Sequence, residues 1–296
     1  MAGDAMRPRG LPDVGRCQIM GVVNVTPDSF SDGGKWFGPD EAIAHGLELA
    51  ESGADIVDVG GESTRPGALR ISEDEELRRV GPVISALASS GIVVSIDTMR
   101  VRVAKMALDA GARLVNDVSG GLADPAMAGL IAESGVPYVV MHWRGHSVDM
   151  QERAHYVDVV KEVIAELSDR VTALTDAGID PAQLIVDPGL GFAKLPPHSW
   201  TLLSRLRELS WLNHPAAPFP LLVGASRKGF IARLLGGEPD LPRPFSECDD
   251  ATVALTAYAA LEGAWCCRVH TVPGNADAVN VAARLLAERH DEERGP

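Results

Sequence analysis

A short apolar segment followed by an amphipathic segment recurs along the chain, and this recurrence constrains the fold more than any other feature. The apolar segments, expected as strands, lie at 19–25, 56–60, 93–97, 114–117, 138–142, 184–187, 221–224 and 266–270. Helical spacing of apolar residues is expected at 40–52, 73–90, 101–110, 125–134, 155–177, 197–209, 227–235, 250–263 and 276–289. Strands that alternate with helices lie parallel and are joined by right-handed crossovers. Eight such units predict a (β/α)8 TIM barrel.

A doubly wound open sheet is the alternative fold. It normally needs fewer strands, and no G-x-G-x-x-G follows the first expected strand, which disfavours a dinucleotide-binding fold. A barrel of this type often occupies about 250 residues as one domain. We therefore expect a disordered N-terminal arm at 1–16, a single barrel domain at 17–290 and a polar C-terminal tail at 291–296.

Composition excludes several classes of function. The net charge of −14 argues against a nucleic-acid partner. The sequence contains no stretch of 18 or more apolar residues, so we expect no membrane span. Met1–Arg16 lacks the apolar core of a signal peptide. The four cysteines have no C-x-x-C spacing, so we expect reduced thiols in a cytoplasmic protein, not zinc ligands. They are Cys17, Cys248, Cys266 and Cys267.

Every expected strand ends on hydrogen-bonding or charged residues. In chain order these are Asn24, Glu62–Arg65, Asp97, Asn116–Asp117, Met141–His142, Asp187, Ser226–Lys228, and Arg268 with His270. The C-terminal ends of barrel strands carry the active sites of such folds. Buried polar groups are costly unless they are paired, so a ring of eight polar strand ends indicates a ligand.

Two carboxylates and an amide converge from the third, fourth and sixth strands, namely Asp97, Asn116 and Asp187. Together they suit a planar heterocycle that carries amino and N–H groups, and Lys228 adds a donor for a ring carbonyl or nitrogen. The alternative is that Asp97 and Asp187 only cap the helices that follow them, as Asp often does.

A second, largely cationic set consists of Asn24, Arg65, Arg268 and His270. The first and last strands of a closed barrel are neighbours, so we expect Asn24 near His270. Arginine pairs well with phosphate oxygens, and Asn24 is suited to hold Mg²⁺ together with a diphosphate, because Mg²⁺ takes few protein ligands beside phosphate oxygens. Alternatively, Arg268 forms an ion pair with a carboxylate of a neighbouring unit.

Several long motifs along the chain resemble one known family. They are N-V-T-P-D-S-F-S-D-G-G, G-G-E-S-T-R-P-G, S-I-D-T, N-D-V-S-G-G, D-P-G-L-G-F, G-A-S-R-K and R-V-H. In this order, from about the first strand to the last, they resemble dihydropteroate synthase. The resemblance implies a transferase of folate biosynthesis, which joins 4-aminobenzoate to a hydroxymethyl-dihydropterin diphosphate and releases diphosphate.

The resemblance also implies roles for individual residues. Pterin contacts would be made by Asp97, Asn116, Asp187 and Lys228; diphosphate contacts by Asn24 (with Mg²⁺), Arg268 and His270; and aminobenzoate contacts by Phe30, Thr64, Arg65, Pro66 and Phe192. Sulfonamides and sulfones would compete with 4-aminobenzoate there. The two loops that carry Phe30 and Thr64–Pro66 would close over the site, and the protein would be a homodimer packed through barrel helices.

Three positions depart from the family pattern, all toward the aminobenzoate and diphosphate ends. Gly229 stands where the family has Ser or Arg, Thr271 where it has Asp, and Cys248 where it has Arg. Each lost charge-assisted contact costs about 1.5–3 kcal/mol. We therefore expect synthase turnover to be weakened or lost. The alternatives are a fully active dihydropteroate synthase and, less favoured, a folate-binding methyl-transfer barrel, which would not need the diphosphate set.

Overall fold

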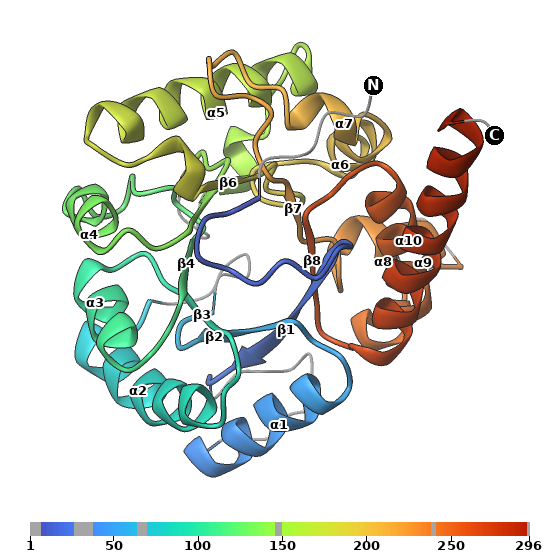
Figure 1. Ribbon diagram of the computed structural model, residues 1–296. Helices are drawn as coiled ribbons and strands as arrows, with labels where there is room; N and C mark the ends of the chain where they lie inside the picture. The colour runs from blue at the N-terminus through green and yellow to red at the C-terminus, as the bar shows by residue number, and fades with distance from the viewer. Residues whose placement is uncertain (1–6, 27–37, 64–69, 146–149, 238–240, 295–296) are drawn as a thin grey trace.

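A computed structural model describes residues 7–26, 38–63, 70–145, 150–237 and 241–294. Eight parallel strands form one sheet in the order β6-β5-β4-β3-β2-β1-β8-β7. A further parallel bridge between Val186 and Leu221 brings the two edge strands together. Figure 1 shows the strands at the centre and the helices around them. This arrangement confirms the predicted TIM barrel.

The strands lie close to the predicted segments. They are β1 (Gln18–Asn24), β2 (Ile56–Gly60), β3 (Val94–Asp97), β4 (Leu114–Asp117), β5 (Tyr138–Met141), β6 (Leu184–Asp187), β7 (Leu222–Val223) and β8 (Cys266–Val269). The side chains of successive strand residues point alternately inward and outward. Inward residues such as Met20, Ile56 and Leu114 form a small apolar core inside the barrel. Outward residues such as Ile19, Val57 and Val115 pack in the larger core beneath the helices.

The helices surround the barrel. They are α1 (Pro39–Glu51), α2 (Glu73–Ser89), α3 (Val101–Asp109), α4 (Met127–Ser134), α5 (Val159–Asp176), α6 (Pro196–Ser204), α7 (Leu206–Leu209), α8 (Gly229–Leu235), α9 (Asp249–Leu261) and α10 (Pro273–Arg294). Two differences from the expected helices have local causes. Helix α5 starts at Val159 because the Asp158 side chain caps it by accepting from the Lys161 amide. Helix α10 starts early, at Pro273, where proline is favoured as a first helical residue.

The expected helix at 197–209 is divided, because Arg205 leaves helical geometry between α6 and α7. Three short 3-10 helices lie in connections, η2 (Met150–Arg153), η3 (Pro181–Gln183) and η4 (Phe245–Cys248). The last of these follows α8 and comes to lie beside the mouth of the barrel.

Residues 7–16, within the arm that we expected to be disordered, cover the N-terminal end of the barrel. Gln18 donates to the carbonyl of Pro12 at 2.8 Å, Arg16 forms a two-pronged ion pair with Asp55 at 2.7 and 3.1 Å, and Leu11 packs against the inner core. At the other terminus α10 continues into the expected polar tail. In the described ranges, every helix is too short or too polar to cross a membrane.

Candidate active site

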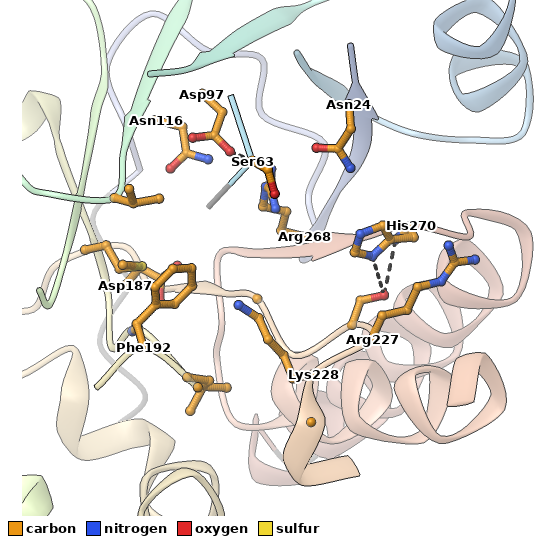
Figure 2. Close-up of a pocket in the computed structure, with 18 of the residues that line it drawn as sticks. Asn24, Ser63, Asp97, Asn116, Asp187, Phe192, Arg227, Lys228, Arg268 and His270 are labelled. Carbon is orange, nitrogen blue, oxygen red and sulfur yellow. Dashed lines mark hydrogen bonds and ion pairs between the residues drawn. The ribbon is translucent and has the colours of Figure 1, made fainter. Parts of the chain in front are cut away.

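A cavity of about 470 Å³ opens at the C-terminal ends of the strands. All eight of the predicted site residues that the structure describes line it: Asn24, Asp97, Asn116, Asp187, Phe192, Lys228, Arg268 and His270. Figure 2 shows these side chains around one space. Phe30, Thr64, Arg65 and Pro66 lie outside the described residues, as do most residues of the two expected closing loops, so their roles stay predictions.

The floor of the cavity carries the predicted hydrogen-bonding set. Asp97, Asn116 and Asp187 are only 4–8% exposed, and Figure 2 shows Asp97 beside Asn116, with Asp187 and Lys228 on the other side of the space. Two glycines lie beside this set, and a Cβ atom at either would make only ordinary van der Waals contact with a floor carboxylate. A Cβ atom at Gly60 would lie 3.5 Å from the Asp97 side chain, and one at Gly224 would lie 4.0 Å from Asp187 Oδ2. The floor is therefore an open slot bordered mainly by acceptors.

Arg268 lies on this floor, although we had grouped it with a cationic set nearer the rim. Its Nε donates to Asp58 Oδ2 at 2.7 Å and its Nη2 donates to Asp97 Oδ2 at 2.8 Å. Its ion pairs are thus with carboxylates of β2 and β3, which lie two and three strands away from β8, whereas the alternative that we considered was a carboxylate of a neighbouring unit. Burial opposes its charge, but Asp58 and Asp97 outweigh that effect and raise the pKa of Arg268.

Burial shifts the pKa values of three residues on the floor. It raises the pKa of Asp97 to about 7, against the lowering effect of Arg268. Burial also raises the pKa of Asp187, although the Gly189 amide and Lys228 oppose the shift. Burial lowers the pKa of Lys228 to about 8 despite the nearby carboxylate of Asp187. Such shifts in one cavity are typical of a functional site.

At the rim, His270 is held by a serine. Its Nδ1 lies 3.0 Å from Ser226 Oγ, and its backbone N–H donates to the same oxygen at 3.3 Å, as Figure 2 shows. Asn24 and His270 lie on the same side of the cavity in that view, in agreement with the expected neighbourhood of β1 and β8.

Thr271, one of the three departures, has a carboxylate beside it. Thr271 Oγ1 donates to Asp249 Oδ2 at 2.6 Å, and Arg227 makes a two-pronged ion pair with Asp249 at 3.2 and 3.0 Å. Asp249 begins α9, so it reaches the end of β8 from a different unit. The rim therefore retains a carboxylate at this place, although it comes from another part of the sequence.

The other two departures have opposite environments. A Cβ atom added at Gly229 would meet nothing within 4 Å, so this position at the start of α8 opens onto the cavity. Cys248 is fully buried in the core between η4 and α9. A longer side chain thus fits at position 229, whereas an arginine at position 248 would place a guanidinium in apolar surroundings.

Phe192 is positioned by a buried polar network behind the cavity. Lys194 Nζ donates to the Phe192 carbonyl at 3.1 Å and lies 2.9 Å from His142 Nδ1, while His142 Nε2 lies 2.9 Å from Glu166 Oε2. Burial lowers the pKa of Lys194 to about 7 and that of His142 to about 4. The centroid of the Phe192 ring lies 4.1 Å from Lys228 Nζ in the cavity. Because Glu166 belongs to α5, the network connects this helix to the cavity wall.

The loop that carries Phe192 needs a glycine at its start. Gly189 has a φ of +66°, and a Cβ atom there would lie 2.5 Å from the carbonyl oxygen of His142. A side chain at this position would clash with the backbone at the end of β5. The close approach brings the loop over the end of β5, where Lys194 meets His142.

Four contributors were missed by the sequence analysis: Asp58, Lys194, Asp249 and Phe245. Asp58 left a usable signal, because it is a charged residue at an inward position of an otherwise apolar strand. Lys194, Asp249 and Phe245 occur in loops or at helix starts, where no periodicity marks their direction. Phe245 lines the cavity from η4, between the helices that we expected at 227–235 and 250–263.

Comparisons with known proteins agree with this geometry. A family model described as pterin binding enzyme matches residues 20–270. A curated dihydropteroate synthase of Mycobacterium leprae is 53% identical over 270 residues, which are 91% of this chain and 93% of that protein.

Solved structures show the same fold. A Xanthomonas albilineans dihydropteroate synthase with 4-aminobenzoic acid superposes with a TM-score of 0.82 at 42% identity, over 92% of this chain and 94% of that one. A Yersinia pestis dihydropteroate synthase in complex with a sulfonamide drug superposes with a TM-score of 0.86 at 37% identity, over 95% and 98% of the two chains.

Proposed function

The chain belongs to the family of pterin-binding enzymes, and we propose that it is a dihydropteroate synthase of folate biosynthesis. The observation that carries the proposal is the floor of the cavity, where Asp97, Asn116 and Asp187 converge with Lys228 in one buried slot. Three acceptors and one donor complement a flat ring with several N–H groups and one carbonyl. A methyl-transfer barrel is less well supported, because the relatives described above are synthases.

The proposed reaction makes limited chemical demands on the protein. The C–O bond between the pterin methylene and the diphosphate breaks, and the electron-rich ring delocalises the resulting positive charge. The amino nitrogen of 4-aminobenzoate then forms the new C–N bond and loses a proton. No strong base is needed, since the arylamine is already nucleophilic. The protein has to hold the ring, stabilise the departing anion and align the amine.

The floor would hold the pterin ring, and the rim would hold the diphosphate. Asn24 and His270 lie together on one side of the cavity, and Ser226 fixes the imidazole orientation. Phe192 would form one wall for the aminobenzoate, as the same residue would for a sulfonamide or sulfone. The family resemblance supports these assignments.

We also propose that Asn24 holds Mg²⁺ together with oxygens of the diphosphate. Among the described residues, no three His, Cys, Asp or Glu side chains are grouped to hold a metal ion. The ion would therefore rely on Asn24 and the substrate, which suits Mg²⁺, because it is often bound through one or two protein groups plus phosphates. The bound ion would neutralise charge on the leaving diphosphate.

The surroundings of Thr271 and His270 bear on the expectation of weakened turnover. Asp249 supplies a carboxylate next to Thr271, and Ser226 holds His270, so these positions are compensated. The expectation of reduced activity now depends on Gly229, where the family pattern has a Ser or Arg side chain that would meet the carboxylate of 4-aminobenzoate. We propose a working synthase with a reduced affinity for the aminobenzoate.

A homodimer remains part of the proposal. Val281 and Leu285 are exposed one helical turn apart on α10, which supports an interface on the barrel helices. Light scattering of the purified protein should give twice the mass of the chain, and a monomer at micromolar concentration would overturn this part.

The function is tested by a coupled assay that measures diphosphate release and dihydropteroate formation from both substrates, with calorimetry of the pterin diphosphate alone. We expect equal yields of the two products and saturable binding of the pterin. Pterin binding without turnover would leave a binding protein of the same family. Absence of both would overturn the proposal.

A further inference from the structure

Asp58 is a buried carboxylate one layer beneath the cavity. It occupies an inward position of β2, and the strand register pairs it with Ser95, whereas the next inward residue, Gly60, pairs with Asp97 on the cavity floor. Asp58 is fully buried. A charge buried this far from water is costly and requires compensation from its partners.

Both partners of Asp58 line the cavity. Asp58 Oδ2 accepts from Asn116 Nδ2 at 2.9 Å and from Arg268 Nε at 2.7 Å. Because the amide nitrogen of Asn116 donates downward to Asp58, the amide oxygen is the atom that a ligand can use. The same contact with Arg268 holds the guanidinium in the plane where its other nitrogen reaches Asp97.

The remaining oxygen of Asp58 indicates that the carboxylate does not serve stability alone. Oδ1 has no hydrogen-bond partner among the described residues. A buried carboxylate retained for folding should have both oxygens satisfied, as Asp117 has through Ser119, Gly121 and Tyr138. In Asp58 the contacts are instead concentrated on two groups of the cavity floor.

We propose that Asp58 is a positioning residue of the synthase site, which fixes the amide orientation of Asn116 and the guanidinium of Arg268 for recognition of the pterin ring. The inference rests on the proposed function. Asp58 acts through these two side chains and does not touch the substrate. Removing its charge should loosen both groups at once and lower the affinity for the ring, while the aminobenzoate subsite near Phe192 and Gly229 stays as it is.

The test begins with Asp58→Asn, which preserves the shape of the side chain. Its new amide group can occupy the Oδ1 side, where it displaces no protein partner. We expect the Kd for the pterin diphosphate to rise roughly 10–100-fold, the usual effect of removing an outer partner of a ligand-holding group. The KM for 4-aminobenzoate should change less than about twofold, because that subsite makes no contact with Asp58. Ser95→Ala is the matched control, since it alters the same layer of the barrel at a hydroxyl that has no hydrogen-bond partner among the described residues, and we expect it to leave the Kd unchanged.

A double variant distinguishes positioning from general damage to the core. In an Asn116→Ala background, Asp58→Asn should cause less than half of its original change in Kd, since one of its two targets is gone. Equal effects in both backgrounds would contradict action through Asn116.

The pH dependence of pterin binding gives an independent measure. Asp97 faces Arg268, Asp58, Glu76 and Asp117, and the negative charge of Asp58 contributes to its raised pKa. Asp58→Asn removes that charge and also loosens Arg268, whose lowering effect on the pKa of Asp97 ranks above the raising effect of Asp58, so the acidic midpoint of binding should move to higher pH. A purely structural role would lower the melting temperature and leave the midpoint in place.

The outcomes separate this inference from the proposed function. An unchanged Kd and an unchanged midpoint in folded Asp58→Asn would overturn the positioning role even if the parent protein is an active synthase. If Asp58→Asn fails to fold, Asp58→Ser is measured in its place with the same expectations. A parent protein that binds the pterin but does not turn over would overturn the synthase proposal alone. A parent that binds no pterin would overturn both.

Discussion

The floor and the rim of the cavity differ in where their residues come from. On the floor, Asp97, Asn116 and Asp187 are the last or next-to-last residues of β3, β4 and β6, so the strand register determines their position. At the rim, Asp249 from α9 reaches Arg227 and Thr271 at the end of other units. The position of a floor residue is thus set by its own strand, whereas the carboxylate beside Thr271 at the rim comes from a different element.

The largest expected effect is on the floor. Asp97→Ala or Asp187→Ala should raise the Kd for the pterin diphosphate more than about 100-fold, because each removes a buried charged acceptor and leaves ring N–H groups unsatisfied. Calorimetry measures the loss. Thr271→Ala is the rim control, and we expect it to change this Kd by less than about threefold. A floor variant that binds like the parent would mean that these carboxylates only support the fold.

The floor could be predicted from the sequence for two reasons. The C-terminal ends of parallel barrel strands meet at one edge, and the polar residues stand at those ends. The rim could not be predicted to the same extent. Asp249 and Thr271, which share a hydrogen bond, are 22 residues apart in the sequence, and Lys194 and His142, which also lie in contact, are 52 residues apart. Both contacts depend on how loops fold back, which local spacing does not encode. Asp58 was missed for a different reason, since one acidic residue in I-V-D-V-G did not alter the reading of that segment as a buried strand.

The pH dependence of pterin binding should report on the floor of the cavity separately from the rim. Asp97 has a raised pKa of about 7, so it gains its charge, and becomes a pure acceptor, only as the pH rises through that value. Lys228 has a lowered pKa of about 8 and loses its charge above it. Pterin affinity should therefore rise through pH 7 and fall above pH 8. The two limbs belong to coupled groups, because Lys228 also faces Asp187, Arg268 and Asp97.

The variant Asp97→Asn separates the acidic limb of the pH profile from the basic limb. It removes the ionisation near pH 7 and should abolish the acidic limb, while the fall above pH 8 remains. Affinity measured by calorimetry from pH 5.5 to 9 checks this expectation. A parent protein with constant affinity over this range would show that neither group titrates in the binding reaction.

At the rim we expect a smaller effect, confined to the second substrate. Gly229→Ser places a hydroxyl in open space next to the cavity and should lower the KM for 4-aminobenzoate up to about tenfold through one additional hydrogen bond to a charged group. The Kd for the pterin should not change. Thr271→Asp should give little further gain, because Asp249 already supplies a carboxylate there.

Cys248→Arg is the contrasting variant, because Cys248 is buried in the core and is not among the residues that line the cavity. It places a guanidinium in the core, so it should lower the free energy of unfolding by several kcal/mol without improving turnover. Chemical denaturation measures the first quantity and the coupled assay the second. A gain in turnover with Cys248→Arg, or an unchanged KM for 4-aminobenzoate with Gly229→Ser, would contradict our assignment of these two positions.

The smallest effect should come from the network behind the cavity wall. Lys194→Met removes the donor to the Phe192 carbonyl but fills a similar volume, so the loop should keep its course and lose one restraint. We expect the KM for 4-aminobenzoate to rise about two- to fivefold, in line with the loss of one hydrogen bond of about 0.5–1 kcal/mol. The pterin Kd should stay within twofold, since the substitution leaves Asp97, Asn116, Asp187 and Lys228 in place. A larger loss of pterin affinity would mean that the network acts on Asp187, which Lys194 also faces, and that floor and rim are coupled through this side of the barrel.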